Sequence, residues 1–86
     1  MKIKEGYVLR NVAGEYIVMN IGGDTSLNHM ITLNETGALI WNGIADGKSE
    51  SEIAELIVSQ YEVDTETAAS DIKKFIDKMN GAGVLE

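Results

Sequence analysis

The stretch that decides the fold runs from Gly22 to Gly37 and reads "GGDTSLNHMITLNETG". Its first residues, "GGDTS", are of the types that turns prefer. Leu27 to Leu33 then alternates between two sets of side chains, which predicts a short β-strand with two distinct faces. Asn34 is a good helix N-cap and Glu35 follows it at once, which favours the start of a helix. The stretch therefore predicts a loop, a third strand and a first helix.

Two further strands are predicted upstream. Residues 7–21, "YVLRNVAGEYIVMNI", are dense in Val, Ile and Tyr, and Ala13-Gly14 interrupts them. Two apolar runs around a break that contains glycine predict a β-hairpin. The second run has two faces, with Ile17, Met19 and Ile21 on one and Tyr16 and Val18 on the other.

Three amphipathic helices are predicted downstream. The first follows Asn34 and ends near Asp46-Gly47. Ser49 with Glu52 three residues later fits the capping box that would begin the second helix. Asp64 is the predicted N-cap of the third helix, and glycine residues close to the C-terminus end it. The last two apolar residues, Val84 and Leu85, would fold back or pair with the sheet.

The element order and the short connections predict the fold class. Three strands followed by three helices indicate an α+β domain, a three-stranded antiparallel sheet with three helices, which is winged-helix-like. A length of 86 residues predicts a single domain over residues 1–86 with a thin core. Helical spacing assigns Trp41, Leu56, Ile72 and Phe75 to that core.

Composition argues against several classes of function. There is no Cys, and a zinc site with the single His29 would depend on carboxylates, which suit zinc poorly, so we expect no metal or cofactor. The net charge of -7 repels phosphate backbones, which argues against nucleic acid. No apolar run is long enough for a membrane span or a signal peptide, so we expect no membrane partner and a cytoplasmic location.

Three classes of function fit the residues poorly. A phosphopantetheine carrier has a Ser directly after an Asp at a helix start, whereas Thr25 separates Asp24 from Ser26 and a strand-like run follows. A winged-helix DNA-binding or regulatory domain needs a cationic recognition helix, but residues 65–82 hold three Lys and three acidic residues. The sequence shows no nucleophile paired with a base and no cluster of metal ligands, so nothing in it indicates an enzyme.

Three motifs, in their order and spacing, resemble the PqqD-like proteins, a family of small domains named for pyrroloquinoline quinone biosynthesis. The matching segments are "LNETGALIW" (Leu33 to Trp41), "DGKSESEIAELI" (Asp46 to Ile57) and "DIKKFIDKMNGAGVLE" (Asp71 to Glu86). With the hairpin before them, the resemblance covers essentially the whole chain. Family members share their fold with the recognition element of ribosomally made, modified peptides.

The resemblance implies a non-enzymatic function. Family members bind the leader segment of a precursor peptide and deliver it to a modifying enzyme, often a radical S-adenosylmethionine protein. The leader is implied to add as a further strand beside the third strand, in a groove that the third helix flanks. The expected partners are therefore a precursor leader peptide and a peptide-modifying enzyme, with no nucleic acid and no membrane.

The residues of the third strand suit strand addition. Natural proteins usually protect a free sheet edge with Lys or Pro, and "SLNHMITL" contains neither. Added strands take affinity from main-chain hydrogen bonds and specificity from neighbouring side chains. The candidate peptide-binding residues are Asn28, His29, Met30, Ile31 and Thr32 on the strand, and Ala69, Lys73 and Ile76 on the third helix.

Alternatives stay open for several of these residues. Met30 is adaptable enough for a binding surface but also fits a core or a plain surface. His29 shares its face with apolar residues, which favours a hydrogen-bonded histidine over a ligand. Lys73 and Lys74 would either meet acidic leader residues or form a solvated helix face. Asp71 would cap, pair with a Lys or orient the groove. The free edge leaves a monomer and an edge-strand homodimer open.

Overall fold

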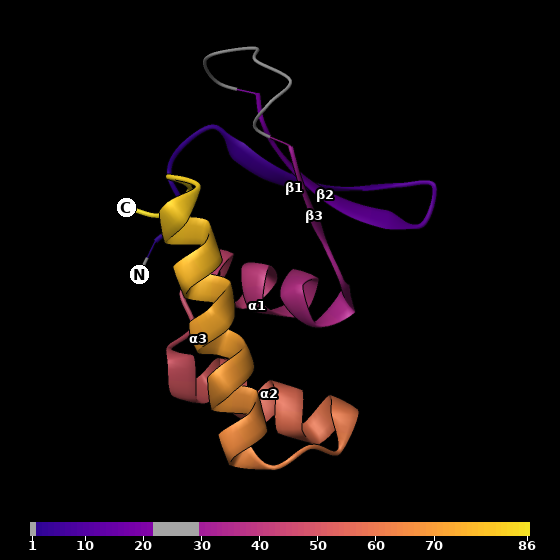
Figure 1. The fold of residues 1–86 in the computed structure, drawn as a ribbon, viewed down its shortest axis with the longest axis vertical. Helices are drawn as coiled ribbons and strands as arrows, with labels where there is room; N and C mark the ends of the chain where they lie inside the picture. The colour runs from indigo at the N-terminus through magenta and orange to yellow at the C-terminus, as the bar shows by residue number, and fades with distance from the viewer. Residues whose placement is uncertain (1, 22–29) are drawn as a thin grey trace.

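The computed structural model describes residues 2–21 and 30–86, and it shows the predicted α+β order of three strands and then three helices (Figure 1). The strands are β1 (Tyr7–Val12), β2 (Glu15–Asn20) and β3 (Ile31–Leu33), and the helices are α1 (Glu35–Ala45), α2 (Glu50–Tyr61) and α3 (Thr65–Gly81). All three helices lie together on one side of the sheet in Figure 1. The likeness to a winged helix is loose, because it extends only to a small sheet beside three helices.

β1 and β2 form the predicted hairpin. Their antiparallel pairing runs from Tyr7 with Asn20 to Val12 with Glu15, so Ala13 and Gly14 make a two-residue turn. Both turn residues have positive φ, 53° for Ala13 and 85° for Gly14. Positive φ at both positions is the geometry of a type I′ turn, whose twist matches that of the flanking strands.

β3 lies at an edge of the sheet. It pairs antiparallel with β2, and the strand order is β1-β2-β3. The described strand, Ile31–Leu33, is shorter than the predicted Leu27–Leu33, since residues 27–29 lie outside the described residues. Met30 immediately precedes the strand and is exposed rather than part of the core.

The two faces of the sheet differ in what covers them. Because side chains alternate along a strand, one face carries the residues that join the helical core and the other carries those that do not. The inner face comprises Tyr7, Leu9, Tyr16, Val18, Ile31 and Leu33, which are buried in the core or packed against it. The outer face comprises Val8, Arg10, Val12, Glu15, Ile17, Met19 and Thr32.

Local capping explains where each helix begins. The Asn34 side chain accepts a hydrogen bond from the Gly37 backbone N–H at 2.8 Å, which confirms the predicted N-cap of α1. The predicted capping box at the start of α2 is present, and the third helix has its predicted aspartate cap. Each cap satisfies a backbone donor that the first helical turn leaves without a partner.

The core lies between the helices and the inner face of the sheet. Trp41, Ile72 and Phe75 are buried, as their spacing predicts. The prediction was wrong for Leu56, which is only half buried. α2 buries Ile53 and Ile57 instead, and Leu56 lies on the flank of that stripe.

The two ends of the described chain hold each other in place. Val84 and Leu85 fold back and are buried, as predicted, but they pair with the N-terminal segment and not with the main sheet. Ile3 forms a β-bridge with Leu85, and the Lys4 backbone N–H donates to the Val84 carbonyl oxygen at 2.8 Å. This pairing fixes the C-terminal end of α3 relative to β1.

Gly43 allows α1 and α2 to pack closely, which a pair of substitutions tests. A Cβ at position 43 would lie 2.7 Å from Cγ1 of buried Ile53, whereas one at Gly81 would meet nothing within 4 Å. Both Gly→Ala changes increase helix propensity. The difference between their free energies of unfolding therefore reports the cost of overpacking, about 1–3 kcal/mol. We expect Gly43→Ala to be less stable than Gly81→Ala by that amount in urea denaturation. Equal stabilities would contradict the close packing.

Two helix caps make stability depend on pH. Hydrogen bonds from the Ser49 backbone and hydroxyl lower the pKa of Glu52, and hydrogen bonds from the Thr67 side chain and backbone lower the pKa of Asp64. As the pH falls, the carboxylates of Glu52 and Asp64 are therefore protonated in the unfolded chain, at about pH 4, before they are protonated in the folded protein. The stabilisation is complete above that pH and disappears as the pH falls through the lowered folded-state values.

Glu52→Gln with Asp64→Asn removes both titrating groups and keeps a hydrogen-bonding side chain at each cap. We expect its melting temperature to fall less than that of the wild type between pH 5 and pH 3, followed by circular dichroism. Glu15→Gln, a carboxyl outside the caps, serves as the control. An acid sensitivity identical to the wild type would show that these caps do not carry the effect.

Candidate functional site

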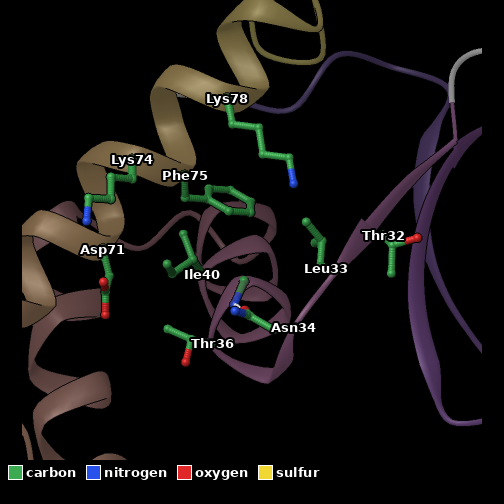
Figure 2. Close-up of a pocket in the computed structure, with 10 residues that line it drawn as sticks. Thr32, Leu33, Asn34, Thr36, Ile40, Asp71, Lys74, Phe75 and Lys78 are labelled. Atoms are coloured by element: carbon green, nitrogen blue, oxygen red, sulfur yellow. Dashed lines mark hydrogen bonds between the residues drawn. The ribbon is translucent and has the colours of Figure 1, made fainter.

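A hollow of about 630 Å³ lies beside the edge of β3 that pairs with no other described strand (Figure 2). Its walls come from β3, from the first turns of α1 and from α3, and we call it the β3–α3 hollow. Its lining residues are Thr32, Leu33, Asn34, Thr36, Gly37, Ile40, Asp71, Lys74, Phe75 and Lys78.

One wall of the hollow is a single continuous segment, residues 32–40. β3 ends at Leu33 and α1 begins at Glu35, so Asn34 alone connects the strand to the helix. The side chain of Leu33 is buried in the core and that of Asn34 caps the helix. This segment therefore has little freedom to move, and the edge of β3 is held beside the start of α1.

The opposite wall is one side of α3. Asp71, Lys74, Phe75 and Lys78 follow the spacing i, i+3, i+4 and i+7, which places them on neighbouring positions of a helix surface. In Figure 2 Phe75 lies over Ile40, and the Lys78 side chain extends from α3 toward β3. The Lys78 side chain thus reaches toward β3, and apolar side chains of α1 and α3 lie next to it.

The chemistry of the hollow combines an apolar floor with a charged rim. Leu33, Ile40 and Phe75 are each no more than 7% exposed and form the floor. On the rim, Lys74 and Lys78 outnumber Asp71, although the whole chain has a net charge of -7. The start of α1 adds partial positive charge, since helix N-termini carry unpaired backbone N–H groups. The arrangement suits a ligand with an apolar group and a carboxylate.

The predicted strand residues reach different environments. Thr32 lines the β3–α3 hollow, whereas Ile31 packs against the core on the inner face. Met30 is exposed just before the strand. Asn28 and His29 lie outside the described residues. Of the three strand candidates that the structure describes, Thr32 therefore borders the hollow, although its side chain belongs to the outer face of the sheet.

The predicted residues of α3 do not line this hollow. Ala69 lines a second hollow of about 560 Å³ between α2 and α3. Lys73 is exposed, and Ile76 is half buried against the core. A role in peptide binding for these three residues stays a prediction, but it would have to be exerted away from the β3–α3 hollow.

Helix geometry explains the difference. Successive residues of an α-helix are about 100° apart, so the buried stripe of α3, which includes Ile72 and Met79, has two flanks. Asp71 and Lys78 lie on the flank that faces β3, and Ala69 lies on the other flank, which faces α2. The spacing of residues 71, 74, 75 and 78 is visible in the sequence, but nothing local shows which flank meets the strand.

Two features that would indicate another kind of site are absent from residues 2–21 and 30–86. Within these ranges no three side chains of His, Cys, Asp or Glu gather where they could hold a metal ion. The same ranges contain no helix with the length and apolarity to cross a membrane.

Comparison with known proteins gives a consistent result. The family model for Coenzyme PQQ synthesis protein D (PqqD) matches residues 15–85. The solved structure of TbiB1 in complex with the TbiA(beta) leader peptide is similar to this chain, with 27% identity, a TM-score of 0.82, and coverage of 100% of this chain and 95% of that one.

A lasso peptide synthetase B1 complexed with the leader peptide shares the fold, with 22% identity, a TM-score of 0.81, and coverage of 99% of this chain and 95% of that one. No curated protein matches the chain. The family match extends from β2 through all three helices to the bridge at Leu85. The chain therefore belongs to the PqqD family.

Proposed function

We propose that this protein is a non-catalytic peptide-binding chaperone. It captures the leader of a ribosomal precursor peptide by strand addition at β3 and presents it to a modifying enzyme, of the radical S-adenosylmethionine type. The observation that carries the proposal is the free edge of β3 directly beside the β3–α3 hollow. The similarity to TbiB1, whose structure contains a leader peptide, supports it.

Strand addition uses both features of the site. A peptide strand beside β3 would lie about 4.8 Å away and exchange main-chain hydrogen bonds with it. Every second side chain of the peptide would then point toward α3 and into the hollow. Because the described strand has only three residues, Ile31–Leu33, its backbone offers few hydrogen bonds. The side chains in the hollow must therefore supply much of the affinity and most of the specificity.

The hollow selects for a particular peptide chemistry. An apolar side chain of the peptide would bury itself against Leu33, Ile40 and Phe75, with a gain of about 0.8 kcal/mol for each methylene removed from water. An acidic side chain nearby would meet Lys74 or Lys78. Such partly solvated ion pairs contribute at most about 1 kcal/mol each, but they increase the association rate.

Location and assembly follow from the same proposal. A ribosomal precursor is made in the cytoplasm, so we place the protein there. A second copy that paired through β3 would occupy the edge that the peptide needs. We therefore propose that the peptide-bound form is a monomer. DNA binding is not favoured, because α3 carries equal numbers of Lys and acidic residues.

Charge reversal on α3 tests the location of the peptide. Lys74→Glu with Lys78→Glu replaces attraction by repulsion at the rim of the hollow, which we expect to weaken leader binding at least tenfold, or about 1.4 kcal/mol. The probe is the leader of the precursor encoded beside the gene, titrated by calorimetry at about 0.1 M salt.

Lys73→Glu is the charge-matched control for the single change Lys74→Glu, since Lys73 is exposed on the same helix but does not line the hollow. We expect Lys73→Glu to change leader affinity by less than threefold. If Lys73→Glu lost as much leader affinity as Lys74→Glu, or more, the peptide would lie on the other flank of α3.

Backbone substitution in the leader tests strand addition itself. In an antiparallel or parallel pair, only alternate backbone N–H groups of the added strand point toward the edge it joins. We expect N-methylation, scanned residue by residue, to weaken binding at every second position of the leader. A helical or irregular peptide would show another period, and such a result in calorimetry would exclude pairing with β3.

A further inference from the structure

The outer face of the sheet carries apolar side chains that join no core, next to the polar residues Arg10, Glu15 and Thr32. Val8, Ile17 and Met19 are half buried, and none of them packs against the buried cluster beneath the sheet. Val12 and Ile21 are more exposed still, at 49% and 61%. The Ile21 backbone N–H donates to the Gly6 carbonyl oxygen at 2.8 Å, which continues the β1–β2 pairing by one step. We call these five residues the outer apolar face.

The helices do not cover this face. Figure 1 shows α1, α2 and α3 on the opposite side of the sheet, where the inner-face residues pack. Val12 and Ile21, with Met30, are the large hydrophobic residues that are most exposed among those described. A gathering of exposed apolar side chains commonly marks a surface that another protein covers.

The outer apolar face is continuous with the edge of β3. The pairings of Arg10 with Ile17 and of Ile17 with Thr32 form one row across the sheet, which ends at that edge. A peptide strand added beside β3 would extend this row, because half of its side chains would point outward next to Thr32. Protein and peptide would then present one composite surface.

We propose that the outer apolar face, extended by the outward side chains of the bound leader, is the docking surface for the peptide-modifying enzyme. The inference rests on the proposed function, because it requires a peptide strand at β3. It follows that the enzyme binds the complex of protein and leader more tightly than the protein alone. By thermodynamic linkage, the enzyme must strengthen leader binding by the same factor.

The charge of the protein argues for an enzyme surface rather than a second copy. Two copies would each carry a net charge of -7 and repel each other at a distance. A cationic partner with an apolar patch would complement the acidic chain as a whole and the apolar side chains of this face, which lie beside Arg10 and Glu15. A second copy on this face would also cover the outward leader side chains that the enzyme must recognise.

Two lysine substitutions on the most exposed positions of the face test the inference. Val12→Lys with Ile21→Lys places charges within the proposed interface, without changing any residue of the core or of the β3–α3 hollow. The matched control is Asn11→Lys with Ala82→Lys. Asn11 is the exposed neighbour of Val12 on β1 with the opposite side-chain direction, and Ala82 is exposed after α3. Both variants gain the same charge.

The probes are the leader peptide and the modifying enzyme encoded in the neighbouring genes. For the wild type, we expect saturating leader to increase enzyme affinity at least fivefold in surface plasmon resonance. For Val12→Lys with Ile21→Lys, we expect leader affinity within twofold of the wild type and enzyme affinity at least tenfold lower. The control should match the wild type in both measurements. Ile17→Thr, which keeps a β-branched residue in β2, should reduce enzyme affinity severalfold.

Three results would overturn the inference. These are enzyme affinity equal in the lysine variant and its control, enzyme affinity unaffected by the leader, and a wild-type dimer that the lysine variant abolishes in sedimentation. The proposed function fails separately if the wild type binds no leader at all. This inference alone would be overturned if the wild type bound the leader but substitutions on the outer apolar face did not change enzyme affinity.

Discussion

The direct junction between β3 and α1 is the constraint on which the site depends. Leu33 is buried in the core, and the next residue, Asn34, accepts the hydrogen bond that caps α1. Because no loop separates the strand from the helix, the edge of β3 and the first turn of α1 behave as one rigid wall. A free edge on a mobile segment would have to be ordered before a peptide could pair with it, and that ordering costs about 1–2 kcal/mol for each residue.

α3 forms the opposite wall of the site. Its C-terminal end is held by the pairing of Ile3 with Leu85, and its buried stripe packs on α1 and α2. With the helix fixed in this way, Lys74 and Lys78 lie at the rim of the β3–α3 hollow. In the proposed function, the sheet edge would supply sequence-independent hydrogen bonds, and the hollow would supply the selection among peptides. A chain of 86 residues with a thin core can support such a site because the site is built from secondary structure and not from loops.

The sequence predicted the elements well, whereas its peptide-binding residues stay a prediction. The hairpin turn, the three helix caps and the edge position of β3 agree with the structure. The flank of α3 that lines the β3–α3 hollow could not be chosen from the sequence, because residues 69, 73 and 76 and residues 71, 74 and 78 lie on opposite flanks of the same buried stripe. Either set makes a consistent helical face. The choice depends on which flank is turned toward β3 when α3 packs.

What the sequence by itself determined is therefore local. Caps, turns and the two periodicities depend on residues within a few positions of one another, so Asn34, Asp64 and the Ala13-Gly14 turn are recognisable without coordinates. Only the tertiary structure decided which sheet face is covered, since Tyr16 and Ile17 belong to two faces that are both apolar in the sequence. The physical reason is that helices cover one face of this sheet, and their side is set by contacts between segments far apart in the chain.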